Sequence, residues 1–408
     1  MTGRPLDRIP AASAGAVQRV ADLDALRAFA LLGILCVNIW YFADPYAITG
    51  IPNPDYSSPV DTAVRFMASV LFEAKFYILF SFLFGYSFVL QWASAAASGA
   101  SEVGRTLRRA AGLVVLGLCH GLFLFYGDIL LTYGLLSLVL LGTRWISGKA
   151  AVTSASILIG AMGVFVLLTG VIAAALEPSA PTGAGTLPPA FGLAGPPAEV
   201  IAQNLALYPT VGVNVLFLQG PIALGAFYAG LACAKQRVFE HGLSPRLLRR
   251  LAAIGLPMGL TAAILQAYLA HYVGGTGTAL IAFGISTLTA PALTAGYVAL
   301  LLLAFRTRPG QQLRALLAPA GKLALSNYLG QSVLMLFVFT GFGLALTNRL
   351  PPLAVLGAAA LIFALQLLAS YIWARQFRYG PLEALLRALT YWRRPTLSRA
   401  TTERSESL

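Results

Sequence analysis

A histidine and an aspartate interrupt an apolar stretch of the sequence, GLCHGLFLFYGDILLTYG at residues 117–134. Ionisable groups inside an apolar segment are costly, which makes them candidates for function. Histidine titrates near neutral pH, so His120 is a candidate general base. The structural alternative is that His120 only makes a hydrogen-bonded contact between helices.

Asp128 follows His120 by eight residues, close to two helical turns, so the two share one face of a continuous helix. They would then lie about 12 Å apart along the axis, too far for a hydrogen bond. If they cooperate, a substrate, a water molecule or a third side chain must lie between them, or the helix must break at Gly127.

A second polar set interrupts LDALRAFALLGILCVNIWYF, residues 23–42. Arg27 and Asn38 are eleven residues apart, three turns, and therefore share a helix face. Asp24 precedes Arg27 by three residues and can pair with it. The alternative is an interfacial salt bridge, with Asn38 joining two helices by hydrogen bonds.

A third set lies in FEAKFYILFSFLFGYSF, residues 72–88, where Glu73 and Lys75 point to different sides of a helix. Lys75 either meets Asp128 or Asp44 and stabilises an anionic group, or extends its stem to water. We expect the candidate catalytic residues to converge on one polar cavity that opens outward. They are His120, Asp128, Asn38 and Lys75.

Composition places these residues in a membrane protein. Of the 408 residues, 58% are hydrophobic and 11% are charged, and the mean hydropathy is +0.77. A water-soluble fold would lack the polar surface to cover itself. The net charge of +13 does not indicate nucleic-acid binding, because the basic residues lie between apolar runs. The three cysteines lie within apolar runs, so we expect no disulfide and no metal site.

Apolar segments of about 20 residues can cross a bilayer as helices. The sequence predicts an all-α polytopic membrane protein with about ten transmembrane helices. It divides into a cytoplasmic segment 1–22, a transmembrane domain 23–375, and a cytoplasmic amphipathic helix and tail 376–408. The predicted spans lie near 24–43, 72–92, 107–126, 128–143, 150–175, 205–233, 251–271, 279–304, 323–346 and 353–374.

The basic residues orient the chain, because Lys and Arg collect in cytoplasmic loops. With the N-terminus inside, all of them except Arg65, Lys75 and Arg349 fall on the cytoplasmic side. The sequence therefore predicts that both termini are cytoplasmic. In the last block, 378–392, we expect an amphipathic helix on the inner leaflet, with Glu383 paired to Arg387.

Several blocks together resemble the YeiB-like family of bacterial inner-membrane proteins, a domain of unknown function. The resemblance covers about residue 20 to 394 and implies a multi-pass protein of the bacterial inner membrane. Its blocks are LDALRAFALLGILCVNI, FEAKFYILFSFLFGYSF, GLCHGLFLFYGDILLTYGL, GKLALSNYLGQS and RYGPLEALLRALTYW.

The first span is also similar, more distantly, to the opening helix of transmembrane acyltransferases. These include the acyltransferase-3 proteins, in which the polar residue eleven positions after the arginine is a histidine, and the heparan-glucosaminide acetyltransferases. Asn38 stands at that position here, as in the latter. No histidine lies between Asn38 and His120. If the acyltransferase chemistry is present, His120 is the only candidate base within the membrane.

The resemblance implies transfer of an acyl group from a cytoplasmic donor to an envelope or small-molecule acceptor. Acyl-CoA is the expected donor, with no permanently bound cofactor, and an Arg-rich inner mouth suits its phosphates. Asn327 and Gln331, four residues apart, either line a donor channel or bridge helices. The candidate substrate- or donor-binding residues are Arg27, Asp24, Glu73, Arg109, Lys322, Asn327 and Gln331.

Two other functions stay open. A transporter or flippase of a small molecule or lipid would use the same polar path, and a non-catalytic scaffold or sensor would use none of it. Many transporters contain internal repeats, and we find none between the halves of this sequence. The expected partners are the lipid bilayer and a small-molecule, lipid or glycan acceptor. The sequence leaves the substrate, the oligomeric state and the existence of an enzymatic activity undecided.

Overall fold

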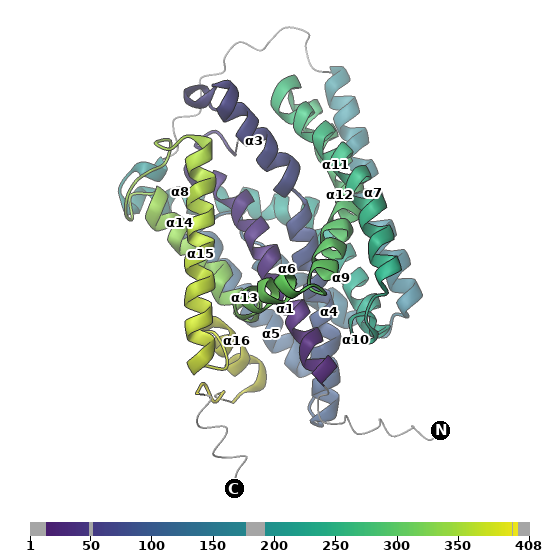
Figure 1. The fold of residues 1–408 in the computed structure, drawn as a ribbon. Coiled ribbons are helices and arrows are strands. Elements are labelled where there is room, and N and C mark those ends of the chain that lie inside the picture. The colour runs from purple at the N-terminus through teal and green to yellow at the C-terminus, as the bar shows by residue number, and fades with distance from the viewer. Residues whose placement is uncertain (1–13, 49–51, 177–191, 394, 399–408) are drawn as a thin grey trace.

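The computed structural model describes residues 14–48, 52–176, 192–393 and 395–398, with side chains from residue 21 onward (Figure 1). Over these ranges the chain is helical and contains no strand beyond an isolated bridge between Phe377 and Ser398. The predicted all-α class is confirmed. Residues 176–200 are rich in Pro, Gly and Ala, and the external loop that this composition predicts falls largely on 177–191, outside the described residues.

Eight helical segments among the described residues are long and apolar enough to cross a membrane. A ninth candidate is a pair of helices bent by 81° at Leu323. The predicted span 128–143 is a helix of only 13 residues. The main helices are α1 (Ala14–Asn38), α3 (Pro59–Phe72), α4 (Lys75–Ala97), α5 (Glu102–Phe123), α6 (Leu130–Gly142), α7 (Gly148–Leu176), α8 (Pro197–Asn214), α9 (Gly220–Lys235), α11 (Pro245–Tyr268), α12 (Thr276–Ala304), α13 (Arg308–Lys322), α14 (Ala324–Phe339), α15 (Pro352–Gln376) and α16 (Pro381–Tyr391).

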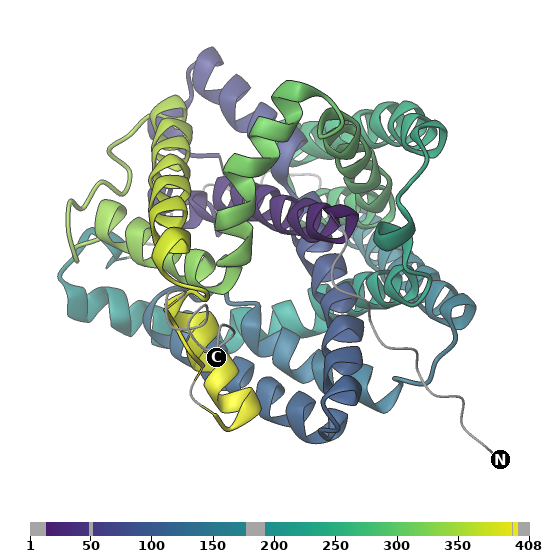
Figure 2. The same ribbon diagram turned by 60° about the horizontal axis from the view of Figure 1, so that its bottom comes forward.

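Helix α1 occupies the centre of the bundle, surrounded by the other helices (Figure 2). It packs most extensively against α13 and also contacts α4, α12, α14 and α15. Gly321 of α13 permits this packing, because a Cβ there would lie 1.6 Å from the carbonyl oxygen of Asp24. The polar residues of the first span are therefore placed next to the bent helix pair.

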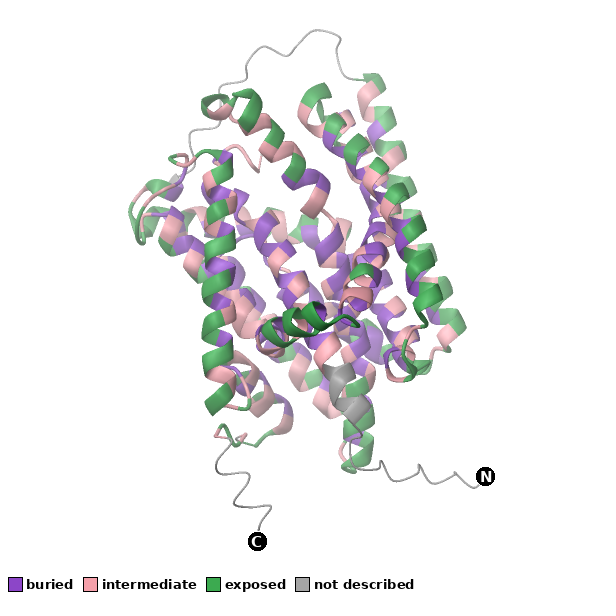
Figure 3. Cartoon of the chain, viewed as in Figure 1, coloured by how far each residue is buried: buried purple, intermediate pink, exposed green. Residues whose placement is uncertain are grey.

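The outer surfaces of α7 and α15 are exposed along their length (Figure 3). The exposed side chains are large and apolar, for example Phe165 on α7 with 59% of its surface exposed and Leu361 on α15 with 62%. Such a continuous apolar surface suits contact with lipid rather than water. The fold is thus that of a membrane protein, as the composition predicts.

The molecule has two distinct ends in Figure 1. We call the end that carries the start of α1, the short helix α10 (Val238–His241) and α16 the lower end, and the end that carries the start of α3 the upper end. The charge distribution predicts that the lower end is cytoplasmic. Helix α3 begins after Ser58, whose hydroxyl caps it by accepting a hydrogen bond from the Asp61 N–H at 3.2 Å.

Candidate functional site

His120 and Asp128 are in direct contact. The Nδ1 of His120 lies 2.8 Å from Oδ1 of Asp128, and its Nε2 lies 2.8 Å from the hydroxyl of Ser332 on α14. The second carboxylate oxygen of Asp128 accepts a hydrogen bond from the Leu131 N–H at 2.9 Å. A serine, a histidine and an aspartate are thereby linked in series.

The contact forms because α5 does not continue to Asp128. The helix ends at Phe123, and the backbone N–H groups of Leu124 and Phe125 both bond to the carbonyl of His120. The chain then folds back, so that α6 starts against α5 at Gly117, where a Cβ would lie 2.2 Å from the Leu131 nitrogen. The separation expected for a continuous helix is therefore wrong, and the break precedes Gly127.

All three side chains of this series are sealed from solvent. His120 is 0% exposed, Asp128 2% and Ser332 1%. The ring of Tyr328 covers the histidine, with the two ring centres 5.1 Å apart. Neither His120 nor Asp128 lines any of the three cavities described below, although Phe125 and Ile129 beside them do.

The upper cavity has a volume of about 480 Å³ and is bordered by amide, carboxylate and tyrosine side chains. Asn38 lines it, as does Glu73, whose carboxylate accepts hydrogen bonds from Ser69 at 2.5 Å and from Gln266 at 3.0 Å. Such a lining suits a ligand rich in hydrogen-bonding groups. Its main polar lining residues are Asn38, Tyr41, Glu73, Tyr77, Gln219 and Gln266.

Lys75 does not reach this cavity. Its ammonium donates to the Ser69 carbonyl at 3.1 Å, across the break between α3 and α4, where Ala74 has a φ of 66°. The lysine thus bonds a carbonyl in the last turn of α3, a favourable place for a cation. Neither Asp128 nor Asp44 is its partner, and the expected convergence of four residues on one cavity is not what the structure shows. It brings His120 and Asp128 together and places Asn38 and Lys75 elsewhere.

A lower cavity of about 360 Å³ collects the cations that the sequence assigned to a donor. Arg27, Arg109 and Lys322 all line it, from α1, α5 and α13. Arg27 also forms the predicted ion pair with Asp24 and donates to the Ser87 hydroxyl at 2.8 Å. Three positive side chains from three helices create a region that favours anions.

The two cavities meet at a pair of tyrosines. Tyr133 of α6 and Tyr328 of α14 line both of them. Tyr133 is held in place by a hydrogen bond of 2.6 Å between its hydroxyl and that of Ser81. We call these two side chains the tyrosine partition. Asn38 and Arg27 of α1 border the cavities above and below it.

The other predicted donor-site residues have structural partners. Asn327 donates to Ser370 at 2.9 Å, and Gln331 donates to Gln366 of α15 at 3.1 Å, so both bridge helices. Glu383 does not pair with Arg387. Its carboxylate accepts hydrogen bonds from the Leu325 and Ser326 N–H groups at 2.7 and 3.0 Å, which caps α14 at the bend.

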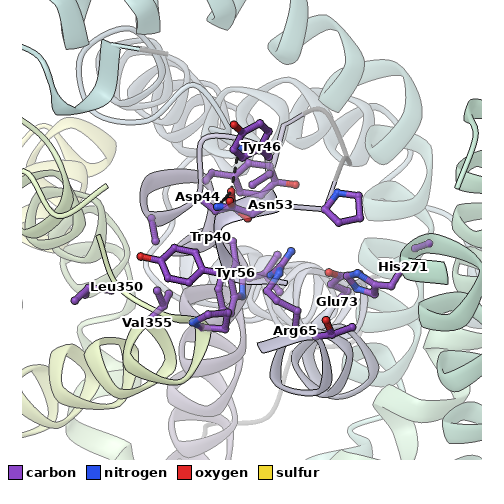
Figure 4. A pocket seen from close by; sticks show the side chains of 18 residues that line it. Trp40, Asp44, Tyr46, Asn53, Tyr56, Arg65, Glu73, His271, Leu350 and Val355 are labelled. Atoms are coloured by element: carbon purple, nitrogen blue, oxygen red, sulfur yellow. Dashed lines mark hydrogen bonds between the residues drawn. The ribbon is translucent and has the colours of Figure 1, made fainter. Parts of the chain in front are cut away.

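A vestibule of about 260 Å³, lined in part by Arg65 of α3, is shown in Figure 4. It shares Tyr41 and Glu73 with the upper cavity. Of its lining residues, the sequence predicts only Glu73 as a candidate site residue. The guanidinium of Arg65 lies 4.0 Å from the centre of the Trp40 ring. Burial raises the pKa of the Asp44 carboxyl. The hydrogen bond from the Tyr46 N–H and the charge of Arg65 lower this pKa, but the effect of burial is larger.

Comparison with known proteins identifies the relatives of this chain. Residues 233–393, which include Tyr328, Ser332 and Lys322, match a family described as "Protein of unknown function (DUF418)". The chain is 29% identical over 393 residues to the uncharacterized protein YxaH of Bacillus subtilis (strain 168), covering 92% of this chain and 94% of that protein. It is 29% identical over 391 residues to the uncharacterized protein YeiB of Escherichia coli (strain K12), covering 92% and 97%.

The resemblance to the YeiB-like family is confirmed. The alignments with YxaH and YeiB extend over almost the whole of each protein, so they include both cavities of the bundle. These relatives are bacterial and carry no assigned activity. The function must therefore be argued from the cavities themselves.

Proposed function

We propose that this protein transfers an acyl group from a phosphate-bearing donor in the lower cavity to an acceptor in the upper cavity. The observation that carries the proposal is the convergence of Arg27, Arg109 and Lys322 on a cavity that meets the upper cavity at the tyrosine partition. The lower end would face the cytoplasm, where acyl-CoA is made, and the upper end would face the envelope.

Besides its charge, the lower cavity has aromatic and apolar lining residues that suit acyl-CoA. Its floor contains Tyr379 and Tyr391, with the Arg387 guanidinium 4.7 and 4.5 Å from the two ring centres. Aromatic rings and guanidinium groups together bind the base and the phosphates of a nucleotide. Phe80 and Leu83 add apolar surface to the lining, which suits an acyl chain, and the Phe80 ring stacks on Tyr133 of the partition with the ring centres 6.1 Å apart.

The upper cavity supplies groups for an acceptor and for the reaction. Asn38 lines this cavity, and we assign to its amide the role of donor to the carbonyl oxygen on which negative charge develops. The Glu73 carboxylate, between Ser69 and Gln266, can accept a hydrogen bond from an acceptor hydroxyl or amine. His120 reaches the cavities only if Tyr328 moves, because that ring covers it.

Transport of the whole ligand is the second candidate, and one observation favours it. The pair α13–α14 is bent by 81°, and the residues at the bend, Lys322 and Ala324, line the lower cavity. Interrupted helices at a binding site are common in transporters. In this chain, however, Glu383 already occupies the N-terminal end of α14.

A doubly labelled donor separates the two functions. Inverted membrane vesicles from cells that produce the protein expose the predicted cytoplasmic end, and acetyl-CoA labelled in both the acetyl group and the adenine is added outside. Acyl transfer retains the acetyl label in the vesicles without the adenine label. Transport delivers both labels in equal amounts. The control is vesicles that contain the Lys322→Gln variant. If wild-type vesicles retain neither label above the level in these control vesicles, both functions are refuted for this donor.

A further inference from the structure

We propose that Ser332 is a nucleophile that carries the acyl group between the two cavities, with His120 as its base and Asp128 as the group that orients the base. This inference rests on the proposed function, because it assigns the covalent step of that transfer. Nothing in the family description or in the sequence singles out Ser332.

Hydrogen bonding fixes the form of the histidine that catalysis requires. The Leu131 N–H donates to Oδ2 of Asp128, and Oδ1 faces Nδ1 of His120 at 2.8 Å. In the proposed arrangement Asp128 is the ionised acceptor, so Nδ1 of His120 carries the hydrogen. In the neutral ring this leaves the lone pair on Nε2, 2.8 Å from the Ser332 hydroxyl. A nucleophile, a base and an orienting group in this order form the signature of an activated serine.

The Ser332 hydroxyl also differs from two other buried hydroxyls in the spans, those of Ser137 and Thr340. Ser137 and Thr340 donate to the carbonyl four residues earlier in their own helices, at 2.6 Å each. Helix hydroxyls commonly make this bond, which satisfies them without any partner helix. Ser332 instead contacts a histidine 212 residues away in the sequence. The series of Ser332, His120 and Asp128 therefore joins three elements, α14, α5 and the turn before α6.

The position of Ser332 explains how donor and acceptor react without sharing a cavity. Ser332 lies one turn after Tyr328, on the same face of α14, and Tyr328 belongs to the partition between the cavities. Rotation of the Tyr328 ring away from His120 would uncover the serine to either cavity. An acyl-serine formed from below can then be attacked from above.

The two steps balance. In the first, the Ser332 oxygen attacks the thioester carbonyl, a C–O bond forms, the C–S bond breaks, and His120 passes the serine proton to the leaving thiolate. In the second, an acceptor hydroxyl attacks the ester, its proton moves to His120, and this proton returns to the serine oxygen as the C–O bond to Ser332 breaks.

The test uses a fluorophosphonate, which phosphonylates activated serines, on the purified full-length protein, with adducts located by peptide mass spectrometry. We expect an adduct on Ser332 that forms faster in Tyr328→Ala, which removes the cover. Asp128→Asn should slow labelling about 100-fold or more, because it disturbs the orientation of the base. Ser332→Ala should lose the adduct, whereas the matched buried variant Ser137→Ala should keep it.

The outcomes distinguish this inference from the proposed function. If neither the wild type nor Tyr328→Ala forms an adduct on Ser332 while the folded protein binds coenzyme A, the covalent step is wrong and direct transfer survives. If Ser332 reacts but the protein does not bind coenzyme A, the nucleophile stands and the proposed donor is wrong. A uniform labelling of surface serines that is unaffected by Asp128→Asn overturns the inference.

Discussion

At the scale of single residues, the buried charges and dipoles of this protein are largely matched by partners close by. Lys75 bonds a helix carbonyl, Asp128 bonds His120 and the Leu131 N–H, and Arg27 bonds Asp24. Such pairing offsets the cost of burying these groups away from water. The lower cavity also gathers several cations in one place, among them Arg27, Arg109 and Lys322.

Arg27→Gln tests that gathering. If the guanidinium contacts a phosphate, its loss removes a charge-assisted hydrogen bond of about 1.5–3 kcal/mol, which corresponds to roughly 10- to 100-fold weaker binding of coenzyme A. Titration calorimetry on the purified protein measures the dissociation constant. Arg314→Gln is the matched control, since Arg314 pairs with Asp22 at 3.0 Å and does not line the lower cavity. Equal affinities for the wild type and Arg27→Gln would remove Arg27 from the donor site.

Asp44 predicts a pH dependence at the upper end. Burial raises the pKa of its carboxyl in the folded protein, so folding favours the protonated form. The contribution of this group to stability is complete below its unfolded pKa and is lost as the pH rises through the raised folded value. The melting temperature of the wild type should therefore fall as the pH rises through this range, which lies above the ordinary carboxyl pKa. Asp44→Asn should lack that component, and identical pH profiles for both proteins would contradict the assignment.

At the scale of helices, glycines set how closely the elements approach. The pair Gly321 and Gly357 gives a sharp comparison, because a Cβ at Gly321 would overlap the Asp24 carbonyl and one at Gly357 would meet no atom within 4 Å. Gly321→Ala should force α13 away from α1 and lower the melting temperature by several degrees or prevent folding. Gly357→Ala should raise stability by about 0.5–1 kcal/mol, because alanine favours a helix. Similar melting temperatures for the two variants would refute the packing at Gly321.

The same scale shows what sequence reasoning reached. Long apolar runs and clusters of Arg and Lys predicted the spans, because a membrane demands both. The end of α5 at Phe123 was missed, since no Pro stands there and the fold-back depends on α6 packing at Gly117. Ser332 was missed because its partner is distant in the sequence, and a serine in an apolar helix is normally satisfied locally.

At the scale of the whole molecule, the placement of the basic residues predicts the direction of the chain across the membrane. Ser57 precedes α3 and His241 ends α10, and both residues are exposed. The start of α3 and helix α10 lie near opposite ends of the bundle (Figure 1). In intact cells, a membrane-impermeant maleimide should label Ser57→Cys and should label His241→Cys only after lysis. The reverse pattern would invert the orientation and place the lower cavity outside.

The central claim is that the lower cavity holds an acyl donor whose reactive end reaches the tyrosine partition. The most direct test is an electron cryomicroscopy map of the purified protein with acetyl-CoA. We predict density for the phosphates at Arg27, Arg109 and Lys322, and density for the thioester beside Tyr133 and Tyr328. An empty lower cavity at saturating acetyl-CoA, or a donor bound only at the upper end, would contradict the account.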